Sequence, residues 1–139
     1  MFKRNLYYLD KNQAITSLCQ EVYDLGYVEG DFIDEVFERE LLSSTAFSNQ
    51  LAIPHAINQN AKHSFFSIVL NDKPMQWDKH MVNIICLFCI RKNERKEFGI
   101  VFEKIINVFS SLDNVMKLKA ANDYSEFIQV LSELIYEPT

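Results

Sequence analysis

Apolar residues at the beginning of the chain recur three or four positions apart, with polar residues between them. The members of the first set are Ile15, Leu18, Val22 and Leu25. Gly26 follows directly, so the spacing predicts an amphipathic helix that a glycine terminates. A second helix is predicted to run from Asp31, a residue type that caps helix N-termini, to about Leu42.

Three segments in the middle of the chain have the composition of β-strands. Residues 51–53 form a short apolar segment, and residues 64–70 are rich in residues that favour strands. Residues 71–74 read Asn-Asp-Lys-Pro, which are residue types that favour a turn. Residues 81–91 are largely apolar and indicate a buried strand.

The last third of the chain returns to helical spacing. A wide apolar stripe extends from Phe98 to Leu112, and a shorter helix is predicted over residues 115–121. Asp123 then precedes a final amphipathic segment that it can cap. Helices, then strands, then more helices predict an α/β fold in which helices cover a small sheet.

Length and composition limit the classes of function. The 139 residues contain 48% hydrophobic side chains and no linker or repeat, so residues 1–139 are expected to form one domain. The formal net charge is −5, and no basic cluster is interleaved with aromatic residues, which argues against direct nucleic-acid binding. No apolar run reaches the roughly 18–20 residues that span a bilayer, so no membrane insertion is predicted.

Three cysteines make an odd number, which favours reduced thiols and a cytoplasmic location over a disulfide framework. Cys86 and Cys89 form a Cys-x-x-Cys pattern, a spacing known from redox and zinc sites. Both lie in an apolar strand, however, where positions three apart point to opposite faces. We therefore expect them to be small buried core residues rather than metal ligands.

A histidine that directly follows a proline is the strongest candidate for chemistry. Pro54 has a fixed φ and biases the residue before it toward extended geometry, so the preceding strand should end here. His55 is then presented in a defined orientation. Arg39 lies upstream, followed by the hydroxyl residues Ser44 and Thr45. An imidazole, a guanidinium group and hydroxyl donors are the groups that a phosphorylated histidine needs.

These residue types also have purely structural interpretations. A lone histidine is more often a surface or core residue than a catalytic one. Arg39 is also placed to be a solvated helix-end residue paired with Glu38 or Glu40, and hydroxyl residues after a helix are often capping or turn residues. His63 and His80 lie in polar surroundings and are predicted to be on the surface.

Residues 39–56 resemble the phosphorylation-site signature of the fructose/mannitol-type (type 2) enzyme IIA domain of the bacterial sugar phosphotransferase system, the PTS. The matching positions are Glu40, Phe47 and residues 51–56. Ser48 stands where the family usually has Gly or Ala. The resemblance continues through residues 73–77 and the apolar strand at 82–90, so it covers nearly the whole chain.

The resemblance implies a small central mixed β-sheet flanked by helices. It also implies that the phosphocarrier protein HPr phosphorylates His55, while Arg39 neutralises the phosphoryl oxygens and Ser44 and Thr45 donate hydrogen bonds to them. Such a transfer requires no ATP, cofactor or metal, and the sequence has neither a Walker-type loop nor metal-ligand spacing.

Members of the family commonly carry a second histidine near the start of the helix after the long strand. Residues 92–98 contain none, and Phe98 occupies that place. This feature resembles the enzyme IIA-like domains at the C-terminus of PTS-controlled transcription regulators. We therefore expect a phosphorylatable regulatory module of a longer chain, beginning at an introduced Met1, with the adjacent regulator domains as partners.

Two other functions remain open on these residues. A free-standing enzyme IIA subunit would pass the phosphoryl group on to an enzyme IIB during sugar uptake. A degenerate module would bind PTS partners without being phosphorylated.

Overall fold

The computed structural model describes residues 2–47, 50–58 and 61–136. Ser48, at which the sequence departs from the family signature, lies outside the described residues. In chain order, the elements are β1 (Phe2–Arg4), α1 (Lys11–Asp24), α2 (Phe32–Leu42), β2 (Ala46–Phe47), β3 (Leu51–Ala52), β4 (Phe65–Trp77), β5 (His80–Cys89), the 3-10 helix η1 (Lys92–Glu94), α3 (Arg95–Phe109), α4 (Leu112–Lys119) and α5 (Tyr124–Tyr136).

Local signals set several of the helix ends. The Gly26 amide donates to the Tyr23 carbonyl at 2.9 Å, and Gly26 has a φ of 78°, so the predicted glycine stop of α1 is confirmed. The Asp123 carboxylate accepts the amide of Glu126 at 2.8 Å, which confirms Asp123 as the cap of α5. The Asp10 carboxylate caps α1 in the same way through the amide of Gln13.

The described strands form one mixed five-stranded sheet with the order β1-β4-β5-β3-β2. β1 is parallel to β4 and β3 is parallel to β5, while the β4–β5 and β2–β3 pairs are antiparallel. The expected mixed sheet flanked by helices is confirmed. The two outermost strands, β1 and β2, were not predicted.

The turn predicted at residues 71–74 is wrong, because β4 continues through this segment. Its register to β5 shifts between Leu70, opposite Ile84, and Met75, opposite Val82, so the extra residues form a wide irregularity in the strand. The side-chain amide of Asn83 donates to the carbonyls of Asn71 and Asp72 at 2.9 and 3.1 Å. These bonds satisfy backbone groups that the ladder leaves open.

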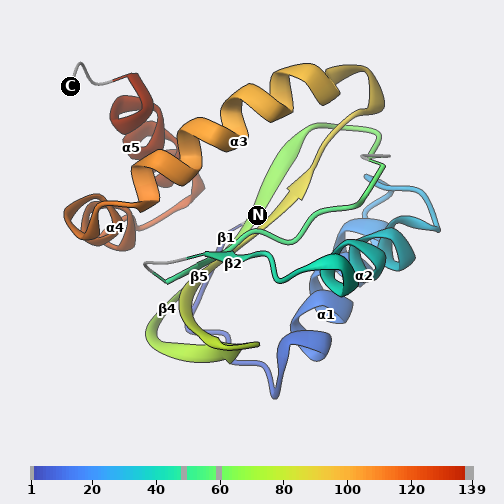
Figure 1. Cartoon of the computed structure of the whole chain (residues 1–139), viewed down its shortest axis with the longest axis horizontal. Helices are drawn as coiled ribbons and strands as arrows, with labels where there is room; N and C mark the ends of the chain where they lie inside the picture. Colours follow the sequence, from blue (N-terminus) through green and yellow to red (C-terminus); the bar gives the residue numbers. More distant parts are fainter. Residues whose placement is uncertain (1, 48–49, 59–60, 137–139) are drawn as a thin grey trace.

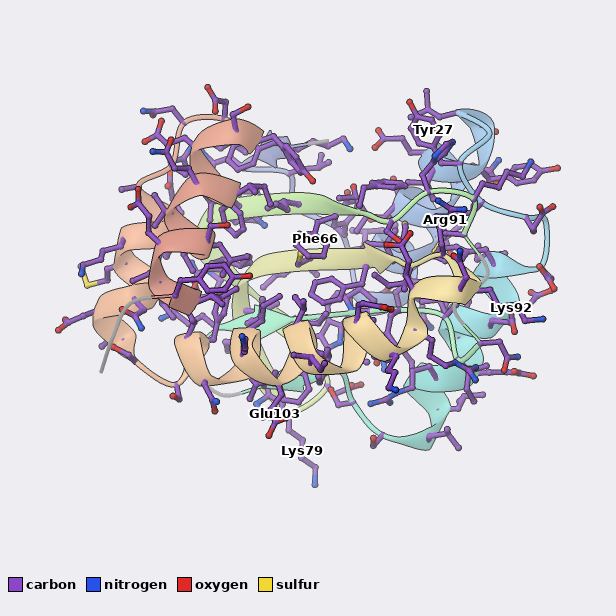
Figure 2. All side chains as sticks on the ribbon, turned by 90° about the horizontal axis from the view of Figure 1, so that it is seen from above. Tyr27, Phe66, Lys79, Arg91, Lys92 and Glu103 are labelled. Carbon is purple, nitrogen blue, oxygen red and sulfur yellow. The ribbon has the colours of Figure 1, made fainter. Side chains whose placement is uncertain are left out.

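Helices cover both faces of the sheet (Figure 1). α1 and α2 pack on one face, where buried residues such as Ile15, Val36 and Ile85 belong to one core cluster. α3, α4 and α5 pack on the other face, where Phe88 and Phe109 belong to a second cluster. Viewed from above, Phe66 lies over the central strands, and the β5–α3 connection lies at one end of them (Figure 2). The sheet thus separates two hydrophobic cores.

The cysteines follow the expectation from strand geometry. Cys86 and Cys89 are both buried in β5 and belong to different clusters, so they point to opposite faces of the sheet. Cys19 of α1 lies in the same cluster as Cys89. All three are free thiols.

Among the described helices, none combines the length and the apolar character needed to cross a membrane.

Candidate functional site

His55 lies where the chain leaves β3 and continues beside β5. The Ile53 amide donates to the Thr45 carbonyl at 3.0 Å, and the Phe88 amide of β5 donates to the Pro54 carbonyl at 3.0 Å. His55 itself forms an isolated parallel bridge with Phe88. Backbone hydrogen bonds on both sides therefore hold the segment that carries the histidine, as the proline before it predicted.

One nitrogen of the His55 ring has a buried partner. Nδ1 lies 2.9 Å from the carbonyl oxygen of Ile53, and His55 is only 8% exposed. Because a carbonyl only accepts hydrogen bonds, Nδ1 carries the proton and donates it, which leaves the lone pair of a neutral ring on Nε2. The tautomer needed for attack through Nε2 is thus fixed by the residue two positions earlier in the chain.

The wall beside the imidazole is aromatic. The ring centroids of Phe98 and Phe102, both on α3, lie 5.6 and 5.8 Å from that of His55. Phe88 of β5 packs edge-on against both phenylalanines. The interpretation that Phe98 takes the place of the family's second histidine is therefore consistent with its position at the ring.

The surroundings of His55 lower its pKa below the ordinary value. Burial is the largest cause, because it disfavours the charged imidazolium; the positive charge of Arg39 acts in the same direction. The Ile53 carbonyl opposes them by stabilising a protonated ring. At neutral pH the imidazole is therefore neutral and able to act as a nucleophile.

Arg39 lies in the last turn of α2, on the opposite side of the sheet from α3. Its Nη1 donates to the carbonyl oxygen of Ser43 at 2.8 Å, and the Ser43 hydroxyl lies 3.3 Å away. The guanidinium group is partly exposed, and its charge reaches His55. The charge of Arg39 thus acts on the pKa of His55, and the role of Arg39 toward a phosphoryl group stays a prediction.

Ser44 and Thr45 face carboxylates instead of the imidazole. The Thr45 hydroxyl donates to the Glu40 carboxylate, and Thr45 is 0% exposed. The Ser44 hydroxyl donates to Asp78 and accepts the amide of Ala46 at 3.1 Å. Thr45 therefore has no free donor for a phosphoryl group, contrary to its expected role, while Ser44 is partly exposed.

A lysine joins the two carboxylates. Lys11 Nζ lies 2.8 Å from Asp78 and 3.5 Å from Glu40, whose residue exposure is only 7%. The buried charge of Glu40 thus has a cation and two donors from Thr45, as a buried carboxylate requires. The solvated arginine–glutamate pair considered for Glu40 is absent from the ion pairs among described residues.

The other two histidines are surface residues, as predicted. His63 is exposed and packs edge-on against Tyr27. His80 is exposed at the start of β5. Both lie outside the ring contacts of His55.

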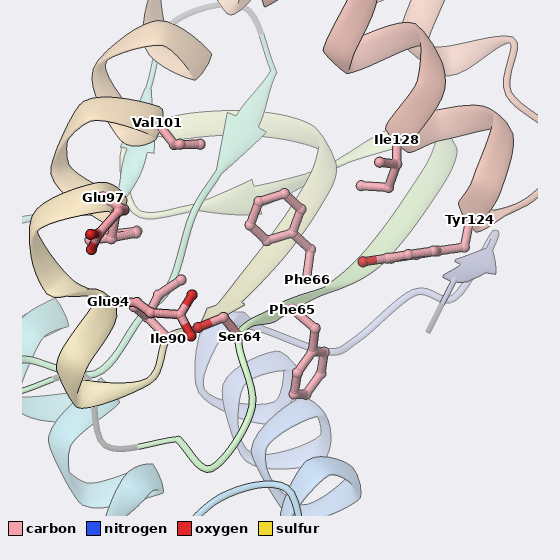
Figure 3. Close-up of a pocket in the computed structure, with 10 residues that line it drawn as sticks. Ser64, Phe65, Phe66, Ile90, Glu94, Glu97, Val101, Tyr124 and Ile128 are labelled. Carbon is pink, nitrogen blue, oxygen red and sulfur yellow. The ribbon is translucent and has the colours of Figure 1, made fainter.

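An apolar cavity of about 270 Å³ adjoins the site between α3, α5 and the start of β4 (Figure 3). Phe66, Tyr124 and Ile128 line it, and so does Phe98. Phe98 is therefore shared by the aromatic wall of His55 and this cavity.

Three parts of this site leave no recognisable signal in the sequence. The Ile53 carbonyl has no side-chain signature, so only the folded backbone reveals it. Lys11 and Asp78 come from elements far apart in the chain, and no short-range pattern connects them to Glu40.

The sequence matches the family model for the phosphoenolpyruvate-dependent sugar phosphotransferase system, EIIA 2, over residues 1–134. It is 34% identical over 129 residues to the mannitol-specific phosphotransferase enzyme IIA component of Geobacillus stearothermophilus, covering 90% of this chain and 87% of that protein. It is 28% identical over 123 residues to the "Probable licABCH operon regulator" of Bacillus subtilis (strain 168), covering 88% of this chain. The matched segment is only 19% of the length of that regulator.

Solved structures share the fold. In the complex of enzyme IIAMtl and phosphorylated enzyme IIBMtl from Escherichia coli, the matching chain has a TM-score of 0.76 at 15% identity, with 94% of this chain and 93% of that chain covered. The α/β architecture is therefore that of mannitol-type enzyme IIA domains. Together with the family match over almost the whole sequence, this shows that the chain belongs to the EIIA type 2 family of the sugar phosphotransferase system.

Proposed function

We propose that this domain accepts a phosphoryl group from phosphorylated HPr on Nε2 of His55. The hydrogen bond from Nδ1 to the Ile53 carbonyl is the observation that supports the proposal most directly. It leaves the Nε2 lone pair as the nucleophile of a neutral ring.

The transfer is an exchange of one N–P bond for another. The Nε2 lone pair of His55 attacks phosphorus while the N–P bond of the donor histidine breaks and its electron pair returns to the donor ring. Nδ1 of His55 keeps its proton, so its hydrogen bond to the Ile53 carbonyl stabilises the positive charge that the ring gains. No proton has to leave His55 during the step.

Arg39 is the residue that we expect to offset the charge of the phosphoryl oxygens. Its planar fork of donors suits such oxygens, and phosphoryl transfer depends mainly on positioning and charge stabilisation. The bond to Ser43 uses Nη1 and leaves other guanidinium N–H groups available. Ser44, which is partly exposed, stays a candidate for a further hydrogen bond.

We propose that the phosphorylated state serves as a regulatory signal about sugar supply, with adjacent domains of a longer regulator as its readers. The apolar Phe98 beside His55 favours this function, because it provides no polar group for onward transfer. The similarity to the licABCH operon regulator supports the same function.

The second candidate is a transport subunit that hands the phosphoryl group to an enzyme IIB. Similarity to mannitol-specific enzyme IIA components over most of their length favours it. The Escherichia coli neighbour is itself recorded in a complex with phosphorylated enzyme IIBMtl, which makes an enzyme IIB a candidate partner here.

Phosphate labelling by phosphorylated HPr tests the acceptor. We expect one phosphoryl group per domain, held in an acid-labile, base-stable bond. His55→Ala should abolish the label, while His63→Ala and His80→Ala should keep it. Full labelling of the folded His55→Ala protein would disprove the assignment.

A further inference from the structure

A chain of hydrogen bonds connects the buried carboxylate of Glu40 to the imidazole of His55. Glu40 accepts from the Thr45 hydroxyl and, at 3.4 Å, from the Thr45 amide. The Thr45 carbonyl accepts the amide of Ile53 at 3.0 Å. The Ile53 carbonyl accepts Nδ1–H of His55 at 2.9 Å. The first two links join the end of α2 to the segment at Thr45 and that segment to Ile53, and the last link lies within residues 53–55.

We propose that Glu40 and Thr45 are positioning residues that set the His55 tautomer through the backbone of Ile53. The inference rests on the proposed function for its biological meaning, although the tautomer itself is a property of the unmodified domain. Neither residue touches the reacting atoms. Both act by holding the backbone of Ile53, whose N–H is bonded to Thr45 and whose own carbonyl, in the following peptide group, accepts the hydrogen bond from Nδ1.

The burial of the pair explains why it can hold a backbone segment. Glu40 and Thr45 are 7% and 0% exposed, so water competes little for their hydrogen bonds. A buried carboxylate that loses a donor is destabilised and draws in water or shifts toward another donor. The Thr45 backbone, and with it the backbone of Ile53, should move when the hydroxyl is removed.

Lys11 anchors the other side of the carboxylate. It lies 3.5 Å from Glu40 and 2.8 Å from Asp78, which itself accepts from the Ser44 hydroxyl. The segment after α2 is therefore held from two directions, by Glu40 at Thr45 and by Asp78 at Ser44.

The test compares three variants with the unmodified protein: Thr45→Val, Thr45→Ser and Glu40→Gln. Thr45→Val keeps the shape but removes the hydroxyl, whereas Thr45→Ser restores it. Ser67→Ala is the matched control, since Ser67 is also 0% exposed and its hydroxyl has no partner among the described residues. The readout is the tautomer of His55, taken from the ¹⁵N signals of the imidazole in the unphosphorylated domain.

We expect Thr45→Val and Glu40→Gln to shift His55 away from the Nδ1–H form, while Thr45→Ser and Ser67→Ala keep it. Phosphorylation by phosphorylated HPr should slow about tenfold in Thr45→Val, the effect of one hydrogen bond of ordinary strength. If Thr45→Val does not fold, Glu40→Gln supplies the same comparison with an isosteric side chain.

Unchanged imidazole signals in folded Thr45→Val and Glu40→Gln would overturn the inference. A general loss of stability without a tautomer change would do so as well, because it would make the pair merely structural. Because the NMR measurement needs no phosphodonor, this result is independent of the labelling of His55. Failure of labelling with an intact tautomer response would instead reject the proposed function.

Discussion

The ring of Phe98 lies 5.6 Å, centroid to centroid, from the imidazole of His55. The two residues come from α3 and from the segment after β3, which β5 holds in place. A phenyl ring offers no hydrogen bond to a phosphoryl group on the proposed acceptor His55. This pairing is suited to a phosphoryl group that stays bound.

Replacing Phe98 by histidine should make His55 a better phosphoryl donor. We expect phosphorylated wild-type protein to retain its label when mixed with enzyme IIB proteins of the same organism, while Phe98→His discharges about tenfold faster or more. Loss of label from the isolated phosphoprotein is the measurement. Phe98→Leu separates loss of the ring from gain of a polar group, and rapid selective discharge of the wild type would identify a transport subunit.

Arg39→Lys should slow phosphorylation by about one to two orders of magnitude. Losing a charge-assisted hydrogen-bond pair costs roughly 1.5–3 kcal/mol, because a lysine copies the planar fork of donors poorly. The free energy of unfolding should hardly change, since the side chain is partly exposed. Arg91→Lys, at an exposed arginine paired with Glu94, is the control. Equal phosphorylation rates for Arg39→Lys and wild type would exclude a role for Arg39 in binding the phosphoryl oxygens.

Titration of His55 by NMR should show a pKa below the ordinary histidine value of about 6.5. Burial is the main cause and the Arg39 charge adds to it, so Arg39→Gln should raise the pKa toward that value. The ¹H shift of the imidazole against pH gives the pKa directly. A wild-type pKa above that of a histidine peptide would contradict the buried, neutral state.

The same lowered pKa makes stability depend on pH. Below about pH 6.5 the unfolded chain takes up a proton at His55 more readily than the folded protein does, so the contribution of His55 to stability falls as the pH falls. Above that pH the imidazole is neutral in both the folded and the unfolded state, so it adds no pH dependence to the free energy of unfolding. Urea unfolding at several pH values, compared with His55→Asn, should show a shallower acid loss in the variant.

Asn83→Ala should destabilise the fold by about 1–3 kcal/mol, because it leaves the carbonyl of the buried Asn71 and that of Asp72 without their donor. Urea denaturation gives the free energy of unfolding. Gln76→Ala removes an exposed amide from the same hairpin and serves as control. If Asn83→Ala lowers the free energy of unfolding no more than Gln76→Ala does, the irregular part of β4 does not depend on the Asn83 amide.

Much of the fold follows from patterns that are local in the sequence. Helices α1, α2 and α5 have apolar faces and recognisable ends, and β5 is a long apolar segment. β1 and β2 have three and two residues, too few for a periodic signal. The residues at 71–74 favour a turn on their own, yet the amide of Asn83 accommodates them within a strand.

The candidate site likewise has residues with a local sequence signal and contacts that only the folded chain creates. The sequence proposes His55 because Pro54 constrains the backbone next to it, and Arg39 because it belongs to the same signature; both roles stay predictions. The Glu40–Lys11 contact joins residues 29 positions apart, and only tertiary packing creates it. The sequence also does not reveal that the Thr45 hydroxyl donates to the buried carboxylate of Glu40.

The three thiols form a natural set of reporters on the two sides of the molecule. Burial raises the pKa of Cys19 to about 12 and that of Cys86 and Cys89 well above the ordinary range, so none reacts readily with alkylating reagents in the folded state. Cys19 and Cys89 become reactive when the α1–α2 layer opens, and Cys86 when the α3–α5 layer opens. The order in which the three thiols are alkylated would reveal which helical layer detaches first, without any introduced cysteine.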